Sequence, residues 1–489
     1  MAALTILHIS DLHRDPNHPV SNDCLLNSLE RDRDRYRNEQ PPIGDPDFVV
    51  VSGDLVQGIP ADCPTPMDHL AAQYEQAESF LSRLAESFLR GDRRRVVIVP
   101  GNHDVSFYHA RHSLRPVVAD PKDPASREVL DGYVSQLHRP DTCIRWSWRD
   151  LCFYEVANKA LYFARVDAFC TFYRQFYRGE RTYSLKPEEQ YDIFDYPEFR
   201  IAFAAFNSCH NNDPLNRRGA FHPDCLAAAT RSLRSRQFAG RLLVAVWHHG
   251  TSGAPNECDY LDTDSVQTII DSGFSIALHG HQHESRVIDE RFRFGSERRM
   301  TVIGAGSLCA GPGGLRAGHR RSYNVIQSDT DRLEGTLHLR TMLNDAFDQP
   351  LWGRGQWAAT GDSFVLFTIQ SPAKEPPAST ADMLRQAEGL VRAQQYKKAI
   401  PLLRTLGASE PLARPLLLEC YFRTDETKAM VDEFYPPMTL SEATLVADAL
   451  WAEKDRDKLR ELLASELVGK SDDPAAEDIC KRYSRRVAS

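Results

Sequence analysis

An α/β fold, followed by an all-helical C-terminal domain, is the fold class that this sequence predicts. Short apolar, β-branched runs alternate with amphipathic helical patterns through much of the first 370 residues. Several of these runs end at Gly, Asp, Asn and His residues, and open α/β sheets place ligand sites at such strand ends. Beyond residue 380 only helical patterns remain.

The first 105 residues predict three strands and one long helix. Apolar runs at 4–9, 48–51 and 96–99 are each closed by polar residues or glycine, as buried strands are. Apolar residues at helical spacing between 68 and 90 predict the helix. The strand–helix–strand order is typical of an α/β sheet.

Residues 105–200 interrupt this pattern. The segment contains no convincing strand run and is rich in aromatic residues, so it predicts a helical, aromatic-rich insertion. Because aromatic side chains dominate ordinary burial, we expect these rings to pack the insertion onto the core. The alternative is that one of them stacks on a substrate base.

The α/β pattern returns at residue 201. A helix is expected after Pro223 and another from Thr263. The expected strands lie at 201–206, 242–246, 276–278, 300–303, 323–326, 336–339 and 364–367.

A proline-rich stretch at 371–380 predicts a linker, and residues 381–489 a separate helical domain. Ala387, Leu417 and Ala447 are spaced by 30 residues, and a second set at Ala399, Ala429 and Leu459 repeats the spacing. Helical hairpins at this period resemble tetratricopeptide-like repeats. A non-repetitive helical bundle is the alternative.

Composition excludes several classes of protein. The net charge of -9 does not suit a protein that coats nucleic acid, although a local basic groove remains compatible with it. No apolar run reaches the roughly 18 residues of a membrane span, and no signal peptide opens the chain. Eleven cysteines without a C-x-x-C motif are typical of reduced thiols. We therefore expect a cytoplasmic protein that does not bind membranes.

Polar motifs follow five of the expected strands. The motifs are D-x-H, G-D, G-N-H-D, a histidine pair and G-H-x-H. Their chemically active residues are Asp11 and His13, then Asp54, then Asn102, His103 and Asp104, then His248, and finally His281 and His283. Because each motif lies at the carboxyl end of a strand, we expect these side chains to meet at one edge of the fold.

Carboxylates, imidazoles and one carboxamide form an oxygen and nitrogen donor set without thiolates. Such sets suit manganese, iron, zinc or nickel. The ligands are too many for one tetrahedral ion, so the sequence predicts two divalent ions, with Mn²⁺ favoured, bridged by a carboxylate. A bridging hydroxide could then attack phosphorus in line, with His103 beside the leaving oxygen.

The order of these motifs resembles the calcineurin-like metallophosphoesterase superfamily over about residues 1–110 and 200–330. The resemblance implies a four-layer α/β/β/α sandwich, with residues 1–370 as the metallophosphoesterase domain. It implies that one ion takes Asp11, His13 and His283, that the other takes Asn102, His248 and His281, and that Asp54 bridges them. It also makes His103 the catalytic histidine and Asp104 the acid that orients it.

Some residues depart from the family's protein phosphatase branch. That branch has GNHE and a longer G-D-x-x-D-R-G, whereas this chain has GNHD and GDLVQG. Gly250 follows the histidine pair where many relatives have proline, which predicts a looser loop beside His248.

Five further residues are candidate substrate contacts. His210 follows the strand at 201–206, and loop arginines near such a site suit phosphate binding. The candidates are His210, Arg217, Arg218, Arg320 and Arg321.

The leading hypothesis is a metal-dependent phosphodiesterase that acts on a nucleotide or nucleic-acid phosphodiester. The alternatives are a nuclease or a phosphatase effector that works within a complex, assembled by a partner-binding module at residues 381–489. Helical repeats present concave surfaces that suit a protein partner or self-association.

Overall fold

The computed structural model of this chain describes residues 4–119, 122–137, 139, 142–253, 258–290, 298–315, 317–344, 346, 348–370, 380–407 and 412–487. The chain forms two compact units, Met1–Lys374 and Glu375–Ser489. The expected linker at 371–380 lies outside the described residues except for Thr380, which begins the first helix of the second unit.

The first sheet of the larger unit has seven strands. One side of the sheet is formed by the expected strands β1 (Leu4–Ile9), β2 (Phe48–Val51) and β3 (Val96–Ile98), which run parallel to one another and end with β3 at the edge. Its other strands, which extend from β1 in antiparallel order, are β13 (Ser322–Asp329), β14 (Glu334–Met342), β15 (Trp352–Arg354) and β16 (Phe364–Thr368).

The second sheet has six strands in the order β11-β12-β10-β9-β8-β7. Four expected strands run parallel at its centre, and two antiparallel strands form its edges. The central strands are β8 (Ile201–Phe206), β9 (Leu242–Val246), β10 (Ile276–His279) and β12 (Met300–Gly304). The edge strands are β7 (Tyr191–Tyr196) and β11 (Arg286–Glu290).

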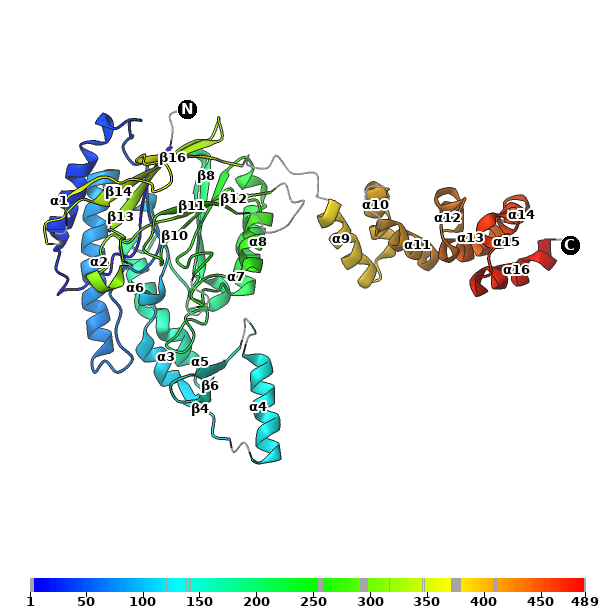
Figure 1. The fold of residues 1–489 in the computed structure, drawn as a ribbon, viewed down its shortest axis with the longest axis horizontal. Helices are drawn as coiled ribbons and strands as arrows, with labels where there is room; N and C mark the ends of the chain where they lie inside the picture. Colours follow the sequence, from blue (N-terminus) through cyan, green and yellow to red (C-terminus); the bar gives the residue numbers. More distant parts are fainter. Residues whose placement is uncertain are drawn as a thin grey trace. The chain divides into compact units, whose positions relative to one another are not determined.

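The two sheets pack face to face between helical layers (Figure 1). Alternate residues of β8 show this directly, because Ile201 and Phe203 belong to the core shared with the first sheet, whereas Ala202 and Phe206 pack under helices. The four-layer α/β/β/α sandwich that the resemblance implied is therefore confirmed. The covering helices are α1 (Asn22–Arg33) and α2 (Pro66–Leu89) on the first sheet, and α7 (Pro223–Leu233) and α8 (Thr263–Asp271) on the second.

Local signals place these helices. Pro66 lies in the first turn of α2, where its missing N–H costs no helical hydrogen bond. Arg90 ends that helix in a left-handed conformation. The side chain of Asp262 caps α8 by accepting a hydrogen bond from the Ser265 N–H.

The insertion at 105–200 is not purely helical, and the expectation that it contains no strand was wrong. It contains the helices α3 (Phe107–Ser113), α4 (Pro124–Gln136), α5 (Lys159–Phe163) and α6 (Asp167–Phe176). A small antiparallel sheet joins them, formed by β4 (Leu114–Pro116), β5 (Ile144–Ser147) and β6 (Cys152–Val156). The strands β4 to β6 are short and carry polar residues. The strand β7, also within the insertion, is an edge strand of the second sheet. None of these four strands forms a continuous apolar run.

The aromatic residues of α6 pack as expected. Phe169, Phe172, Tyr173 and Phe176 are buried in the main core, and the Phe172 ring stacks on Tyr74 of α2 with 5.1 Å between centroids. Trp148 does not follow this expectation, because its side chain is 82% exposed at the turn between β5 and β6. The prediction of packing therefore holds for α6 and fails for Trp148.

The second unit is helical and has a hydrophobic core of its own. Its helices are α9 (Thr380–Arg392), α10 (Tyr396–Leu406), α11 (Ala413–Thr424), α12 (Thr427–Phe434), α13 (Leu440–Ala452), α14 (Arg456–Ala464), α15 (Glu466–Gly469) and α16 (Pro474–Val487). Consecutive helices from α9 to α14 pack on one another, and Ala387, Leu417 and Ala447 lie in the core from α9, α11 and α13. The expected hairpins are present, whereas their membership in the tetratricopeptide-like class stays a prediction.

Two expectations from composition can be compared with the structure. The eleven cysteines, all within the described residues, form no disulfide. Among those same residues, no helix has both the length and the apolar character needed to cross a membrane.

Candidate metal centre

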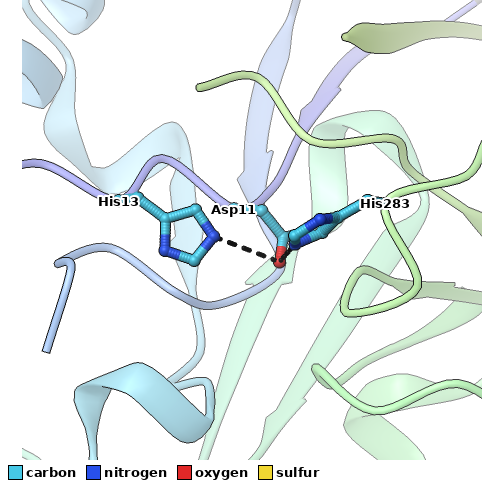
Figure 2. Close-up of side chains that lie close together, drawn as sticks. All are labelled: Asp11, His13 and His283. Carbon is cyan, nitrogen blue, oxygen red and sulfur yellow. Dashed lines mark hydrogen bonds and ion pairs between the residues drawn. The ribbon is translucent and has the colours of Figure 1, made fainter. Parts of the chain in front are cut away.

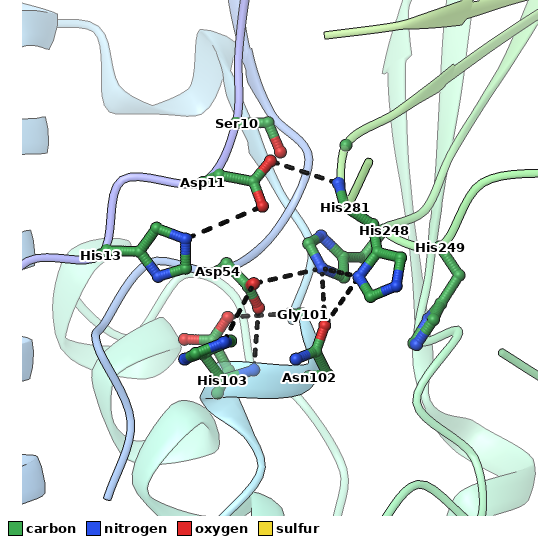
Figure 3. Close-up of polar contacts among 12 residues, drawn as sticks. Ser10, Asp11, His13, Asp54, Gly101, Asn102, His103, His248, His249 and His281 are labelled. Carbon is green, nitrogen blue, oxygen red and sulfur yellow. Dashed lines mark hydrogen bonds and ion pairs between the residues drawn. The ribbon is translucent and has the colours of Figure 1, made fainter. Parts of the chain in front are cut away.

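The predicted metal-binding side chains converge between the two sheets, as Figure 3 shows for most of them. Each follows the carboxyl end of β1, β2, β3, β9 or β10. Asp11 and Asp54 come from the first sheet and His248 and His281 from the second, so the two stacked sheets each contribute part of the site.

Five of the predicted ligands have left-handed backbone conformations. The φ angles are 54° at Asp11, 45° at His13, 53° at Asp54, 73° at His281 and 55° at His283. Residues other than glycine are uncommon in this region, and such conformations cluster at functional sites. The Leu12 and His13 N–H groups both donate to the Asp54 carbonyl, which holds the first two loops together.

Asp11, His13 and His283 form the first half of the site (Figure 2). His283 Nε2 lies 3.1 Å from Asp11 Oδ1, and His13 Nε2 lies 3.9 Å from the same oxygen. One donor atom from each residue lies within 4.8 Å of the others, which is a spacing that can hold one metal ion.

Asn102, His248 and His281 form the second half. Asn102 Oδ1 lies 3.0 Å from His248 Nε2 and 2.9 Å from His281 Nδ1, and these two ring nitrogens are 3.3 Å apart. Donor atoms this close need a proton or a cation between them, because nitrogen and oxygen lone pairs otherwise repel.

Asp54 lies between the two halves. A carboxylate oxygen of Asp54 forms one set with donor atoms of Asp11 and His248. Another set joins Asp54 with donor atoms of His13 and His103. Within each set the donor atoms lie within 4.8 Å of one another. Oδ2 of Asp54 is 3.4 Å from His248 Nε2, and the side chain is only 2% exposed. This is the position that a bridging carboxylate occupies.

Burial and charge show that these residues fit metal ions. Both nitrogens of His13 are buried without a hydrogen-bond partner, and burial lowers the pKa of His13 to about 4, so the ring is neutral as a ligand must be. Burial alone would raise the pKa of the Asp11 and Asp54 carboxyls, but His283 and His248 beside them hold it below its ordinary value. Two buried carboxylates with orphaned imidazole nitrogens suit two divalent cations.

In His248 and His283, the hydrogen bond of the outer ring nitrogen sets which nitrogen faces inward. His248 Nδ1 lies 2.8 Å from the Ser52 carbonyl, and His283 Nδ1 lies 2.5 Å from the Gly314 carbonyl. A carbonyl accepts only from N–H, so Nδ1 carries the proton and Nε2 is left for the ion. Burial opposes a second proton, but Asp54 and Asp11 raise the pKa of His248 and His283 to about 9 in the metal-free protein.

Glycines allow the motifs to approach this closely. A Cβ at Gly101 would lie 2.2 Å from Asp54 Oδ1, and a Cβ at Gly53 would lie 2.5 Å from His248 Nδ1. At Gly250 a Cβ would lie 1.9 Å from Gln282 Oε1, and the looser loop expected there stays a prediction. The glycine leaves room for the Gln282 side chain.

His103 lies at the open side of the site. Its N–H donates to Asp54 Oδ1 at 2.8 Å, its Nε2 lies 4.0 Å from Asp54 Oδ2, and its side chain is 36% exposed. Its Nδ1 lies 2.5 Å from the Gln57 carbonyl. The ring is thus oriented by a backbone carbonyl with Nε2 turned toward the centre.

Asp104 has a different task from the one the resemblance implied. Its carboxylate accepts hydrogen bonds from the Gly101 N–H at 2.8 Å, the Leu55 N–H at 3.2 Å and the Tyr74 hydroxyl at 3.0 Å. No hydrogen bond joins it to His103 within the described structure. Asp104 therefore holds two metal-binding loops together, and Gln57 orients His103.

The five candidate substrate residues make no recorded bond to the metal-binding side chains within the described structure. His210 is buried, with its ring 4.9 Å from His222, and Arg217 and Arg218 are exposed. The Arg320 guanidinium lies 3.4 Å from the Leu343 carbonyl, and Arg321 Nε donates to the Ala310 carbonyl at 2.8 Å. A role in substrate binding stays a prediction for all five.

Several groups around the site carry no signal in the sequence. The Ser52, Gln57 and Gly314 carbonyls are backbone atoms, which no side-chain motif can indicate. Asp259, whose Oδ2 lies 3.2 Å from His281 Nε2, comes from a loop with no recognisable motif.

The layered fold and this two-part ligand set define a metal-dependent phosphoesterase, a hydrolase that acts on phosphate esters. The chain belongs to the calcineurin-like phosphoesterase family, whose family model matches residues 4–285. A search of curated proteins found no match.

The solved structures that match this chain are distant from it. A dimetal phosphatase from Danio rerio is 9% identical, with a TM-score of 0.32, and the match covers 76% of this chain and 100% of that one. GAP50, the anchor in the inner membrane complex of Plasmodium, is 11% identical, with a TM-score of 0.33 and coverage of 77% and 91%. Vps29 of Entamoeba histolytica in complex with Zn²⁺ is 11% identical, with a TM-score of 0.22 and coverage of 70% and 94%.

Proposed function

We propose that this protein hydrolyses phosphodiesters of a nucleotide or nucleic acid, with two Mn²⁺ ions at the site built around Asp54. Bound there, two divalent ions supply an activated water and positive charge at the phosphoryl oxygens. Imidazole and carboxylate donors together suit manganese, whereas magnesium prefers an all-oxygen shell.

The charge around the site supports a diester. Among the recorded hydrogen bonds and ion pairs of the seven predicted ligands in the described structure, none reaches an arginine or lysine. A phosphomonoester carries up to two negative charges at neutral pH and benefits from an arginine clamp, whereas a diester carries one. With no arginine or lysine bonded to these ligands, a singly charged diester suits the site.

His103 is the proposed catalytic residue. Because the Gln57 carbonyl accepts a hydrogen bond from Nδ1–H, only Nε2 can gain or lose a proton during the reaction. Nε2 faces the centre, 4.0 Å from Asp54 Oδ2, on a partly exposed side chain, and we place the leaving oxygen of a bound ester beside it. A protonated Nε2 there donates its proton to that oxygen as the ester bond breaks.

An activity panel tests the proposal. The metal-free chain is reconstituted with Mn²⁺ and assayed with bis(p-nitrophenyl) phosphate, p-nitrophenyl phosphate, cyclic and linear nucleotides, and single- and double-stranded DNA and RNA. We expect the diester to be cleaved with a higher kcat/KM than the monoester. Faster cleavage of the monoester would contradict the assignment, and the Asp54→Asn variant controls for contaminating enzymes.

We also propose that the helical unit binds a protein partner or self-associates, so that the hydrolase acts within a complex. The support is that this unit has its own core and contributes none of the predicted metal ligands. It also exposes large apolar side chains, with Phe422 53% and Met438 73% exposed. Sedimentation and pull-down experiments on a fragment of residues 380–489 test this proposal. Comparison with its Phe422→Ala and Met438→Ala variants would show whether these side chains bind another chain.

A further inference from the structure

We infer that Asp259 is a positioning residue that fixes the tautomer of His281 and raises the affinity of the ion nearest Asn102. This role rests on the two-metal centre proposed above. It is assigned by the position of Asp259, which lies on the loop between β9 and α8.

His281 presents Nδ1 to the centre, whereas His248 presents Nε2. His281 Nδ1 lies 2.9 Å from Asn102 Oδ1, and His281 Nε2 lies on the other side of the ring, 3.2 Å from Asp259 Oδ2. A ring that offers Nδ1 to an ion must carry its proton on Nε2, and that N–H donates to the Asp259 carboxylate.

The partner of this outer nitrogen differs from those of the outer nitrogens of His248 and His283. His248 and His283 donate to backbone carbonyls, which are neutral, whereas His281 donates to a carboxylate. A negative charge at this distance makes the imidazole a stronger electron donor toward an ion on its other side. Asp259 therefore adds binding energy at the second half of the site specifically.

The loop holds Asp259 in place by close packing. A Cβ at Gly253 would lie 2.7 Å from Asp259 Oδ1, so glycine at 253 permits this approach. The Leu261 N–H donates to the Gly250 carbonyl at 2.9 Å, and Asp262 caps α8. The carboxylate is thus fixed between two anchors, one beside the histidine pair and one at the start of a helix.

The assignment is tested by titrating the metal-free full-length chain with Mn²⁺. The electron paramagnetic resonance signal of free Mn²⁺ measures how much of the metal is bound. We expect two sites in the wild type and a loss of about 10- to 100-fold in affinity at one of them in Asp259→Ala. Asp259→Asn keeps an oxygen acceptor without the charge, so its loss should be smaller. Asp264→Asn, on the exposed first turn of α8, is the matched control and should bind as the wild type does.

A double-variant comparison shows whether the effect passes through His281. In a His281→Ala background, Asp259→Ala should change the remaining Mn²⁺ affinity by less than about twofold, because the ring it positions is gone. Thermal unfolding of the metal-free variants should be unchanged, and if Asp259→Ala unfolds, the isosteric Asp259→Asn decides.

Three results are informative in different ways. Wild-type affinity at both sites in Asp259→Ala and Asp259→Asn would overturn the assignment. A further loss on adding Asp259→Ala to His281→Ala would also overturn it, because the effect would then be independent of the ring. A wild-type chain that fails to bind two Mn²⁺ ions would instead overturn the proposed metal centre.

Discussion

Asp54 connects the two halves of the site. Its carboxylate lies within 4.8 Å of donor atoms from Asp11, His13 and His248, and its main-chain carbonyl binds the loop after β1. The same residue therefore organises both the donor atoms and the backbone around them. A change at Asp54 tests the metal centre more directly than a change at any single histidine.

Asp54→Asn should lose Mn²⁺ and nearly all activity, because a neutral amide cannot bridge two cations as a carboxylate does. Metal content after gel filtration and the rate with a chromogenic diester measure this. The fold should be retained, since the two-sheet core does not depend on the metal. Full activity at saturating Mn²⁺ would mean that Asp54 is not the bridge.

His103→Asn should keep both ions while kcat falls about 10²- to 10⁴-fold, because the group that donates the proton is gone. His281→Ala is the contrasting variant, which should lose one ion. Metal analysis of both proteins separates the two roles. Equal depletion of metal in the two variants would contradict the role given to His103.

His210 makes stability depend on pH. Burial, reinforced by Arg165, lowers its pKa to about 3 in the folded protein, against an ordinary value near 6.5. Between these two values the unfolded chain binds a proton that the folded chain does not, so stability falls as pH drops from about 6.5 toward 3.

A His210→Leu variant should therefore lose part of this pH dependence. The melting temperature of the variant minus that of the wild type should increase as the pH is lowered from 7.5 to 5. The increase should correspond to about 1 to 2 kcal/mol of unfolding free energy. Offsets that do not depend on pH, such as altered packing, cancel in this comparison. A constant difference in melting temperature would show that His210 does not titrate as described.

At the scale of elements, α6 attaches the insertion to the catalytic fold. Its Phe172 stacks on Tyr74 of α2, and the Tyr74 hydroxyl donates to Asp104, which holds the loops that carry Asp54 and Asn102. Helix α6 thus links the insertion to the site, whereas the strands β4 to β6 form a separate sheet.

Phe172→Ala should cost about 3 to 5 kcal/mol of unfolding free energy, because it removes a fully buried ring from the core. Trp148→Ala is the control from the same insertion and should cost less than about 0.5 kcal/mol, because that side chain is mostly exposed. Urea unfolding of both variants makes the comparison. Similar costs would mean that α6 does not anchor the insertion.

At the scale of the whole molecule, the metal centre belongs to one compact unit. All seven predicted ligands lie before residue 284, and the unit boundary falls at Lys374. The C-terminal helices have a separate core. Chemistry and the proposed partner binding therefore reside in different parts of the chain.

A chain that ends at residue 371 should express as a folded protein and retain its Mn²⁺ content and its activity on a small diester. Partner binding or self-association should be lost. Soluble yield, metal content and small-substrate turnover measure the outcome. Aggregation, or a fragment that holds both ions but is inactive, would show that the helical unit completes the catalytic unit.

Local patterns in the chain were enough to identify the central strands and most of the metal-binding residues. Apolar runs at 4–9, 48–51, 201–206 and 242–246 became strands, because a strand buried on both faces needs an uninterrupted apolar run. The motifs at Asp11 and Asp54 could be read because short loops carry both the backbone turn and the donor atoms. These signals are local, so one chain without relatives was enough to find them.

The remaining features depend on how distant segments of the chain pack together. Edge strands such as β7, half polar and paired on one side, lack a continuous apolar pattern and escaped prediction. The partners of His103, Asp104 and His281 are a carbonyl, two backbone N–H groups and a distant loop carboxylate. Hydrogen-bond partners of this kind are set by how loops pack in space, and their spacing along the chain carries no information about that packing.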